Sequence, residues 1–171
     1  MKVLLITLLG SMLIAPFAHG HGGHDHGSAG EATFMPVGNE NGAVINLYRD
    51  KSCSCCSKWG ASMAQAGYRV VDHISDEMSS LKEEEGISSD VASCHTAFIS
   101  GYFIEGHVPA ESIDRLLRDM PDLAGLAVPG MPVGSPGMES PMGMAENYNV
   151  VAVGIDGSTS VFDRYQGLNR Q

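Results

Sequence analysis

Four cysteines are the residues of this chain whose types and spacing could do chemistry. Three lie together in the run Cys53-Ser54-Cys55-Cys56, and the fourth, Cys94, stands next to His95. Cysteines that staple an exported domain are usually spread along the chain, whereas crowded thiols indicate metal binding or redox chemistry. Cys53 and Cys56 also have the spacing of a redox-active Cys-x-x-Cys pair. The cluster therefore predicts a working site in which metal binding and dithiol chemistry compete for the same residues.

The kind of metal follows from the thiolates and from the directions in which they point. Thiolates are soft ligands, which favour Cu(I), zinc or iron–sulfur over magnesium or calcium. Consecutive residues at a helix start point about 100° apart, so Cys55 and Cys56 are not expected to share one tetrahedral ion with the other cysteines. Several Cu(I) ions bridged by shared thiolates tolerate such divergence. The pattern favours a site with more than one copper ion, with these ligands: Cys53, Cys55, Cys56 and Cys94.

Other roles for the cysteines and histidines remain open from the residues alone. Two structural disulfides are one alternative, although a Cys53–Cys56 bridge closes too short a loop to stabilise the fold much. His95 could bind the metal, donate a hydrogen bond to a thiolate, or pack in the core. His73 and His107, taken singly, are interpreted as ordinary surface or core histidines.

Two low-complexity segments offer further ligands. Residues 21–41 open with histidines among glycines and are expected to form a disordered tail, which either captures copper, zinc or nickel or is a mere leader. Its candidate ligands are His21, His24 and His26. In residues 128–145, proline and glycine exclude a regular helix or strand. Met131 and Met138 in this loop either offer thioethers to a soft ion or pack over the domain surface.

The elements that must position these residues alternate between strand and helix. Strands are expected at 43–48, 68–74, 96–99 and 102–105, with a final hairpin of 149–155 and 158–162. Helices are expected at 57–66, at 75–85 with Ser75 as cap, and after Pro109. In the last helix an apolar face should pack on the sheet: Ile113, Leu116, Leu117 and Met120.

The order β-α-β-α-β-β-α predicts an α/β domain with a thioredoxin-like fold over residues 42–165. A C-terminal β-hairpin and the Met/Pro/Gly-rich loop 128–145 complete it, and 166–171 is expected to be a tail. The cysteine loop would leave the first strand and open the first helix. Backbone N–H groups there stabilise anions, so we expect thiol pKa values lowered toward neutrality.

Residues 1–20 resemble a secretory signal peptide. Lys2 precedes an apolar run over residues 3–14, and small residues follow at Ala15, Ala18 and Gly20. The run is shorter than the roughly 20 apolar residues that span a bilayer, so the mature form is expected to be periplasmic and not membrane-spanning. The net charge of −10 argues against nucleic acid as a partner.

Four motifs occur in order over about residues 43–165 and resemble the CopG-like family. They are Cys53-Ser54-Cys55-Cys56, Ser93-Cys94-His95-Thr96, Gly101-Tyr102 with Glu105-Gly106-His107-Val108-Pro109, and the segment from Pro129 to Glu139. The resemblance implies a thioredoxin-like fold, a role in periplasmic copper resistance, and a cluster of copper ions bound by the cysteines. It also implies that His95 takes the place of the cis-proline usual beside a Cys-x-x-Cys pair, and it strengthens Met131 and Met138 as ligands.

The leading hypothesis is therefore a periplasmic protein that holds Cu(I), with Cu(I)/Cu(II) redox exchange through the dithiol as a further activity. Copper storage and copper oxidoreductase activity remain alternatives. A rival hypothesis is a thiol–disulfide oxidoreductase for protein substrates, in which Cys53 attacks and Cys56 resolves the mixed disulfide. A third is a passive carrier that hands copper to an efflux system. Efflux or electron-transfer proteins of the periplasm are the expected protein partners.

Overall fold

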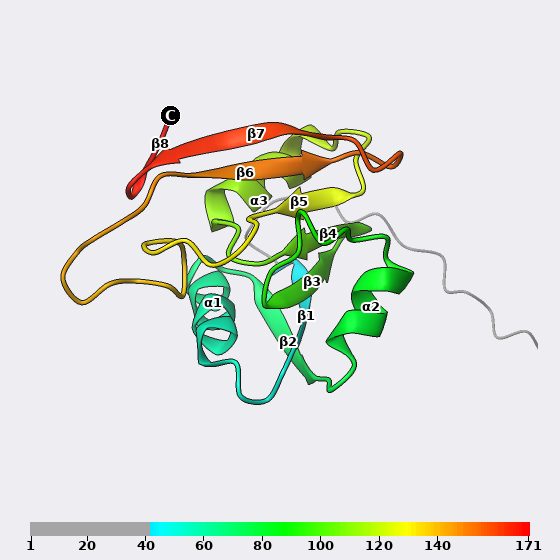
Figure 1. Ribbon diagram of the computed structural model, residues 1–171, viewed down its shortest axis with the longest axis horizontal. Helices are drawn as coiled ribbons and strands as arrows, with labels where there is room; N and C mark the ends of the chain where they lie inside the picture. The colour runs from blue at the N-terminus through cyan, green and yellow to red at the C-terminus, as the bar shows by residue number, and fades with distance from the viewer. Residues whose placement is uncertain (1–41) are drawn as a thin grey trace, which may run out of the picture. The chain divides into compact units, whose positions relative to one another are not determined.

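An eight-stranded mixed sheet runs through residues 42–171, the part of the chain that the computed structural model describes (Figure 1). The strand order is β2-β1-β3-β4-β5-β6-β7-β8. The pairs β1–β2 and β4–β5 are parallel, and the other neighbours are antiparallel. The strands are β1 Val44–Arg49, β2 Arg69–Ile74, β3 His95–Ile99, β4 Tyr102–Glu105, β5 Gly125–Ala127, β6 Tyr148–Val153, β7 Thr159–Gln166 and β8 Asn169–Arg170.

Within residues 42–171, three helices accompany the sheet: α1 Ser54–Gln65, α2 Met78–Glu84 and α3 Ala110–Asp119. The buried apolar residues of α1 and α3 share one core cluster with residues of β1, β3, β4, β5 and β6. The opposite face of the sheet has a second, smaller cluster, to which Ile87 and Val91 contribute from the segment after α2. Figure 1 shows α1 and α2 on opposite sides of β1–β4. The sheet is therefore covered on both faces.

The first helix begins earlier than its sequence pattern indicated. It starts at Ser54 rather than at residue 57, and Cys53 is its N-cap residue. Its buried positions are Cys56, Trp59, Gly60 and Met63, a helical spacing that turns one face toward the sheet. Because the helix starts at Ser54, Cys55 and Cys56 lie in its first turn.

The third helix follows the expected pattern except at its end. Pro109 is the N-cap, and Ile113, Leu116 and Leu117 are buried. Met120, which we expected on the same apolar face, is the C-cap residue in a left-handed conformation and is 41% exposed. The chain leaves the helix one residue too early for Met120 to reach the core.

The second helix was expected to begin at Ser75, and that assignment was wrong. The helix starts at Met78 after Glu77 as N-cap, and the Ser75 hydroxyl instead accepts the Glu77 N–H at 3.1 Å. A serine can hold either a helix start or a local turn with the same hydrogen bond, so the residue type alone did not decide.

The C-terminal half of the sheet is larger than the expected hairpin. β5 is a three-residue strand that pairs with both β4 and β6. Residues 166–171, taken from the sequence as a tail, contain the end of β7 and the strand β8. Asp163 is 5% exposed and links this region to α3, with Arg115 at 3.0 Å, Arg170 at 3.1 Å and the Ser112 hydroxyl at 2.8 Å.

The expected signal peptide at 1–20 and the histidine-rich tail at 21–41, with His21, His24 and His26, lie outside the described residues. Among residues 42–171, no helix combines the length and apolar character needed to cross a membrane.

Candidate metal centre

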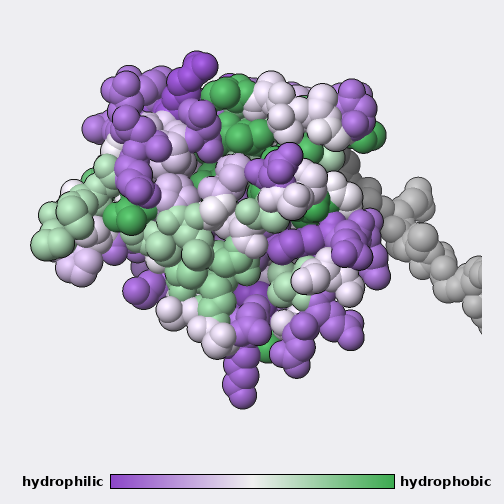
Figure 2. All heavy atoms as spheres, viewed as in Figure 1, coloured by the Kyte–Doolittle hydropathy of each residue, from purple (hydrophilic) through white to green (hydrophobic). Residues whose placement is uncertain are grey.

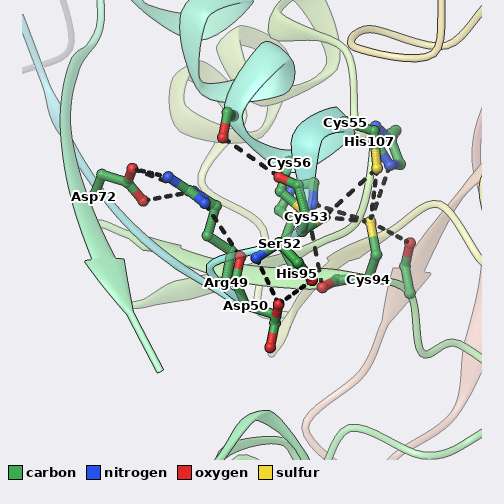
Figure 3. The surroundings of a disulfide bond; sticks show 12 residues. Arg49, Asp50, Ser52, Cys53, Cys55, Cys56, Asp72, Cys94, His95 and His107 are labelled. Carbon is green, nitrogen blue, oxygen red and sulfur yellow. Dashed lines mark hydrogen bonds and ion pairs between the residues drawn. A yellow bond between two sulfur atoms is a disulfide. The ribbon is translucent and has the colours of Figure 1, made fainter. Parts of the chain in front are cut away.

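The site lies where β1 ends and β3 begins. The two strands are antiparallel neighbours, with Arg49 opposite His95, so the loop after β1 and the loop before β3 meet at one end of the sheet. Between β1 and α1, Asp50 holds a turn: its carboxylate accepts the Ser52 N–H at 2.7 Å and its carbonyl accepts the Cys53 N–H at 3.1 Å. The sheet thus brings the start of α1 against Cys94 (Figure 3).

The four cysteines converge within this site. One sulfur from each of them lies within 4.8 Å of all the others. Cys53 Sγ is 3.5 Å from Cys55 Sγ, and Cys94 Sγ is 3.9 Å from Cys55 Sγ and 3.5 Å from Cys56 Sγ. Residues 39 positions apart in the chain therefore form one sulfur cluster.

Two of the four sulfurs are joined in the structure. Cys53 and Cys56 form a disulfide with a Cα–Cα distance of 5.4 Å, while Cys55 and Cys94 are free thiols. This is the Cys-x-x-Cys pair that the sequence indicated as redox-active. A site with four thiolates thus corresponds to the reduced form, and the structure presents the oxidised form.

Three of the sulfur separations fall near the edge length of a metal–sulfur tetrahedron. We expected the 100° divergence of Cys55 and Cys56 to keep these residues from sharing one tetrahedral ion with Cys53 and Cys94. A metal–sulfur bond of about 2.3 Å gives a tetrahedron with edges of about 3.8 Å. The distances of 3.5–3.9 Å between the free thiols and their sulfur neighbours fall near that edge. Cys53 and Cys56 are bonded to each other in this form, so these separations describe the oxidised site, and the binding of more than one copper ion stays a prediction.

His107 belongs to the site, although the sequence predicted an ordinary surface or core histidine at this position. It is fully buried, and its Nε2 lies 3.1 Å from Cys94 Sγ. Its Nδ1–H donates to the Pro136 carbonyl at 2.8 Å, which leaves Nε2 as the nitrogen with a free lone pair. Histidine ligands of metals usually have their second ring nitrogen held in this way. The signal was present in the Glu105-Gly106-His107-Val108-Pro109 motif, but a single histidine gives no indication of its spatial neighbours.

His95 also contacts Cys94, with its Nδ1 3.4 Å from the sulfur, and its ring lies edge-to-face with that of His107 at 5.1 Å between centroids. Its ring is buried against Trp59, at 4.7 Å between centroids, and its Nε2 has no hydrogen-bond partner in the described part of the chain. Cys94, His95 and His107 form a second group of ligand atoms that lie within 4.8 Å of one another. The candidate centre therefore offers nitrogen as well as sulfur. His73, by contrast, stacks on Tyr48 and contacts Asn46, away from the cysteines.

The acid–base properties of the site follow mainly from burial. Burial raises the pKa of the Cys94 thiol to about 12, with the neighbouring Cys55 acting in the same sense. The lowering expected from the helix start therefore does not extend to Cys94, which precedes a strand. Burial lowers the pKa of His95 and of His107, so both rings are neutral at pH 7. Neutral imidazoles can bind a metal directly, whereas a thiol must release its proton to do so.

The Met/Pro/Gly-rich loop 128–145, called the methionine loop below, reaches the site through its backbone. A Cβ on Gly137 would lie 2.6 Å from the Cys55 carbonyl oxygen and 2.7 Å from the Trp59 nitrogen, so the loop packs tightly on the first turns of α1. Met138 follows directly and is half-buried, whereas Met131 is 51% exposed. Figure 2 shows more apolar surface over α1 and this loop than over α2. Met142 and Met144 add to it, with 78% and 55% of their surface exposed.

Two solved structures are similar to this chain, and both are of copper resistance protein CopG. The one described as form 2 is 43% identical, and the match covers 73% of this chain and 99% of that one with a TM-score of 0.70. The one described as form 1 is 44% identical, with 74% and 99% covered and a TM-score of 0.69. Residues 91–138 match a family described as a protein of unknown function, DUF411. No curated protein matches the chain.

The fold and the site together define a mixed α/β protein with a candidate metal centre built around four cysteines. With more than 40% identity over nearly the full length of the similar structures, the chain belongs to the copper resistance protein CopG family. The resemblance of the sequence motifs to that family is thereby confirmed.

Proposed function

We propose that this chain is a periplasmic copper-binding protein of copper resistance, which holds Cu(I) through its cysteines as a cluster of more than one ion. The observation that carries the proposal is the convergence of Cys53, Cys55, Cys56 and Cys94 within 4.8 Å. Sulfur ligands favour Cu(I), and family membership favours copper over zinc. Shared thiolates can bridge neighbouring ions, which supports a cluster over a single ion.

The proposed redox function rests on the Cys53–Cys56 pair. Oxidation of this dithiol to the disulfide releases two protons and two electrons. The two electrons reduce two Cu(II) ions to Cu(I). Reduction of the disulfide by a periplasmic electron donor would restore the thiolates. Cys94 Sγ lies 3.5 Å from Cys56 Sγ, so copper held by Cys94 would be adjacent to the pair that changes oxidation state.

A thioredoxin-like core is part of the proposal. The β-α-β-α-β-β-α order is present from β1 to α3, and these four strands are neighbours in the order β2-β1-β3-β4. The Cys-x-x-Cys pair at the start of α1 supports the same relationship. We regard β5–β8 and the loop 128–145 as additions to this core, with the loop packing on α1.

The decisive experiment is an anaerobic titration of the reduced mature protein with Cu(I) against a competing chelator. We expect saturation above one copper per chain and a large loss of affinity in Cys94→Ser, because this residue contacts two other sulfurs. Saturation at or below one copper per chain, or an unchanged Cys94→Ser variant, would reject the cluster.

A matched histidine pair tests the nitrogen ligand. We expect His107→Gln to weaken Cu(I) binding roughly 10–100-fold, the range known for residues that support a metal site. His73→Gln is the control, because His73 lies outside the sulfur cluster. Equal affinities of the two variants would remove His107 from the site.

A second candidate function is thiol–disulfide exchange with protein substrates. The disulfide at the start of α1 favours it, because the oxidised pair is already formed. This function predicts equal activity on a disulfide substrate with and without copper, and loss of activity in Cys53→Ser.

A passive carrier predicts instead that copper passes to a partner, such as an efflux protein, without a change in oxidation state.

The periplasmic location is proposed from residues 1–20 alone. Cell fractionation and N-terminal sequencing of the native protein test it. We expect a mature N-terminus near Ala18 or Gly20 in the periplasmic fraction, and an uncleaved protein in the cytoplasm would contradict this.

A further inference from the structure

A buried carboxylate lies behind the sulfur cluster and is not part of it. Glu105 is the last residue of β4, is fully buried, and pairs in register with Thr96 of β3. Its Oε1 accepts the Ser93 N–H at 2.5 Å and the Lys82 Nζ at 2.5 Å, and its Oε2 accepts the Thr96 hydroxyl at 2.7 Å. Lys82 reaches it from α2 and also donates to the Thr96 hydroxyl at 2.8 Å.

The contacts of Glu105 fall on both sides of Cys94. Ser93 is the residue before this cysteine, and Thr96 is the second residue after it, so one carboxylate holds the Ser93 backbone on one flank and the Thr96 side chain on the other. The Gly106 N–H, next to Glu105, also donates to the His95 carbonyl at 3.0 Å. Together these bonds fix the point at which the loop before β3 enters the sheet. The direction of the Cys94 side chain depends on that point.

Stability alone is a poor explanation for this arrangement. A buried ion pair contributes little net stability, because removing both charges from water costs about as much as their attraction returns. A carboxylate that accepts a backbone N–H gives instead a directional constraint on the chain. Burial raises the pKa of Glu105, while Lys82 and the hydrogen bonds act in the opposite direction.

We infer that Glu105, held by Lys82, is a positioning residue for Cys94. Glu105 keeps the Cys94 thiol directed at the sulfurs of α1 with or without metal. The inference rests on the proposed function where copper affinity is concerned. Its effect on Cys94 in the metal-free protein is independent of that function. Residues that hold metal ligands in place commonly change affinity roughly 10–100-fold when they are replaced.

The test compares Glu105→Gln with Asp163→Asn in the mature protein. Asp163 is a matched control, because it is also a buried carboxylate with ion-pair partners but belongs to the contact between α3 and β7. Both variants are expected to lower the midpoint of urea unfolding. Only Glu105→Gln is expected to weaken Cu(I) binding, by roughly 10–100-fold.

A second measurement follows Cys94 without copper. In the oxidised metal-free protein, Cys55 and Cys94 are the free thiols, and peptide mapping distinguishes their alkylation by iodoacetamide. Glu105→Gln is expected to change the rate of Cys94 alkylation roughly tenfold, because a charge-assisted bond to its loop is lost. Asp163→Asn should leave this rate within about twofold of wild type, since distant sites act independently.

The outcomes separate the two proposals. If wild-type protein does not bind Cu(I), the proposed function fails, and the alkylation rates still decide on Glu105. If wild type binds Cu(I) and Glu105→Gln behaves as Asp163→Asn in both measurements, the positioning role is overturned. Should Glu105→Gln not fold, Thr96→Val removes one donor to the carboxylate and is expected to shift both readouts in the same direction by a smaller amount.

Discussion

Each free thiol of the site lies next to one sulfur of the disulfide. Cys55 Sγ is 3.5 Å from Cys53 Sγ, and Cys94 Sγ is 3.5 Å from Cys56 Sγ. Reduction of a single bond therefore produces four neighbouring thiols. His107 lies against Cys94 on the side of the methionine loop, with its other nitrogen tied to Pro136. At the scale of residues, the sulfur and nitrogen atoms of the site thus come from three separate stretches of chain, and Pro136 supports them from a fourth.

A glycine in the methionine loop allows this loop to pack closely on α1. Gly137 has φ +85°, and a Cβ there would overlap the backbone of Cys55 and Trp59. We expect Gly137→Ala to lower the free energy of unfolding by roughly 3 kcal/mol, from the left-handed conformation plus the overlap. Urea denaturation of the metal-free protein measures this loss.

Gly143→Ala provides the control for conformation alone. Gly143 has φ +67° but open space around its Cβ position, so we expect a loss of only about 1 kcal/mol. Equal losses in the two variants would show that close packing of the loop on α1 is not required.

At the scale of elements, the strands and helices have different roles in positioning the cysteines. The antiparallel pairing of β1 and β3 places both cysteine segments at one end of the sheet, and α1 supplies three of the four sulfurs from its cap and first turn. α3 contributes no residue to the sulfur cluster. It packs on the same face of the sheet as α1 and shares its core.

This division predicts that α3 supports stability rather than metal binding. Leu116 is fully buried, so Leu116→Ala is expected to cost roughly 2–5 kcal/mol of unfolding free energy by leaving a cavity. The exposed Arg118 offers a control, and Arg118→Ala is expected to stay within about 0.5 kcal/mol of wild type. Both variants should keep the wild-type Cu(I) stoichiometry below their unfolding transitions. A lower stoichiometry in Leu116→Ala would show that α3 also shapes the site.

Several elements could be predicted because local patterns encode them. β4 was expected at its observed bounds, and the buried spacing of Ile113, Leu116 and Leu117 indicated α3. β5 was missed because three residues between other elements have no periodicity of their own. It exists because β4 and β6 provide hydrogen-bonding edges on both sides of it.

At the scale of the whole molecule, two buried neutral histidines couple stability to pH. Burial lowers the pKa of His95 and His107 in the folded state, whereas an unfolded histidine titrates near about 6.5. Below that value the unfolded chain binds more protons than the folded one, so stability falls as the pH is lowered. Each ring contributes a slope of at most about 1.4 kcal/mol per pH unit.

We therefore expect the metal-free protein to lose stability between pH 7.5 and about pH 5.5, measured as the urea midpoint. His107→Gln should reduce the slope, because one of the two buried rings is then absent. A midpoint that is constant or rises as the pH falls over this range would contradict neutral, buried histidines.

Residue types and their local spacing specify which chemistry this chain can perform and the order of most of its elements. Crowded thiols at Cys53, Cys55 and Cys56 indicate soft-metal or redox chemistry wherever they lie, and apolar periodicity and turn residues act over a few positions. Which of these groups contact each other depends on the folded chain. Three contacts join residues that no local pattern connects. They are those of His107 with Cys94, of Pro136 with His107, and of Glu105 with the loop that carries Cys94. These contacts depend on strand register and on the loop packed over α1, because only the folded sheet fixes the distances between residues that are far apart in the sequence.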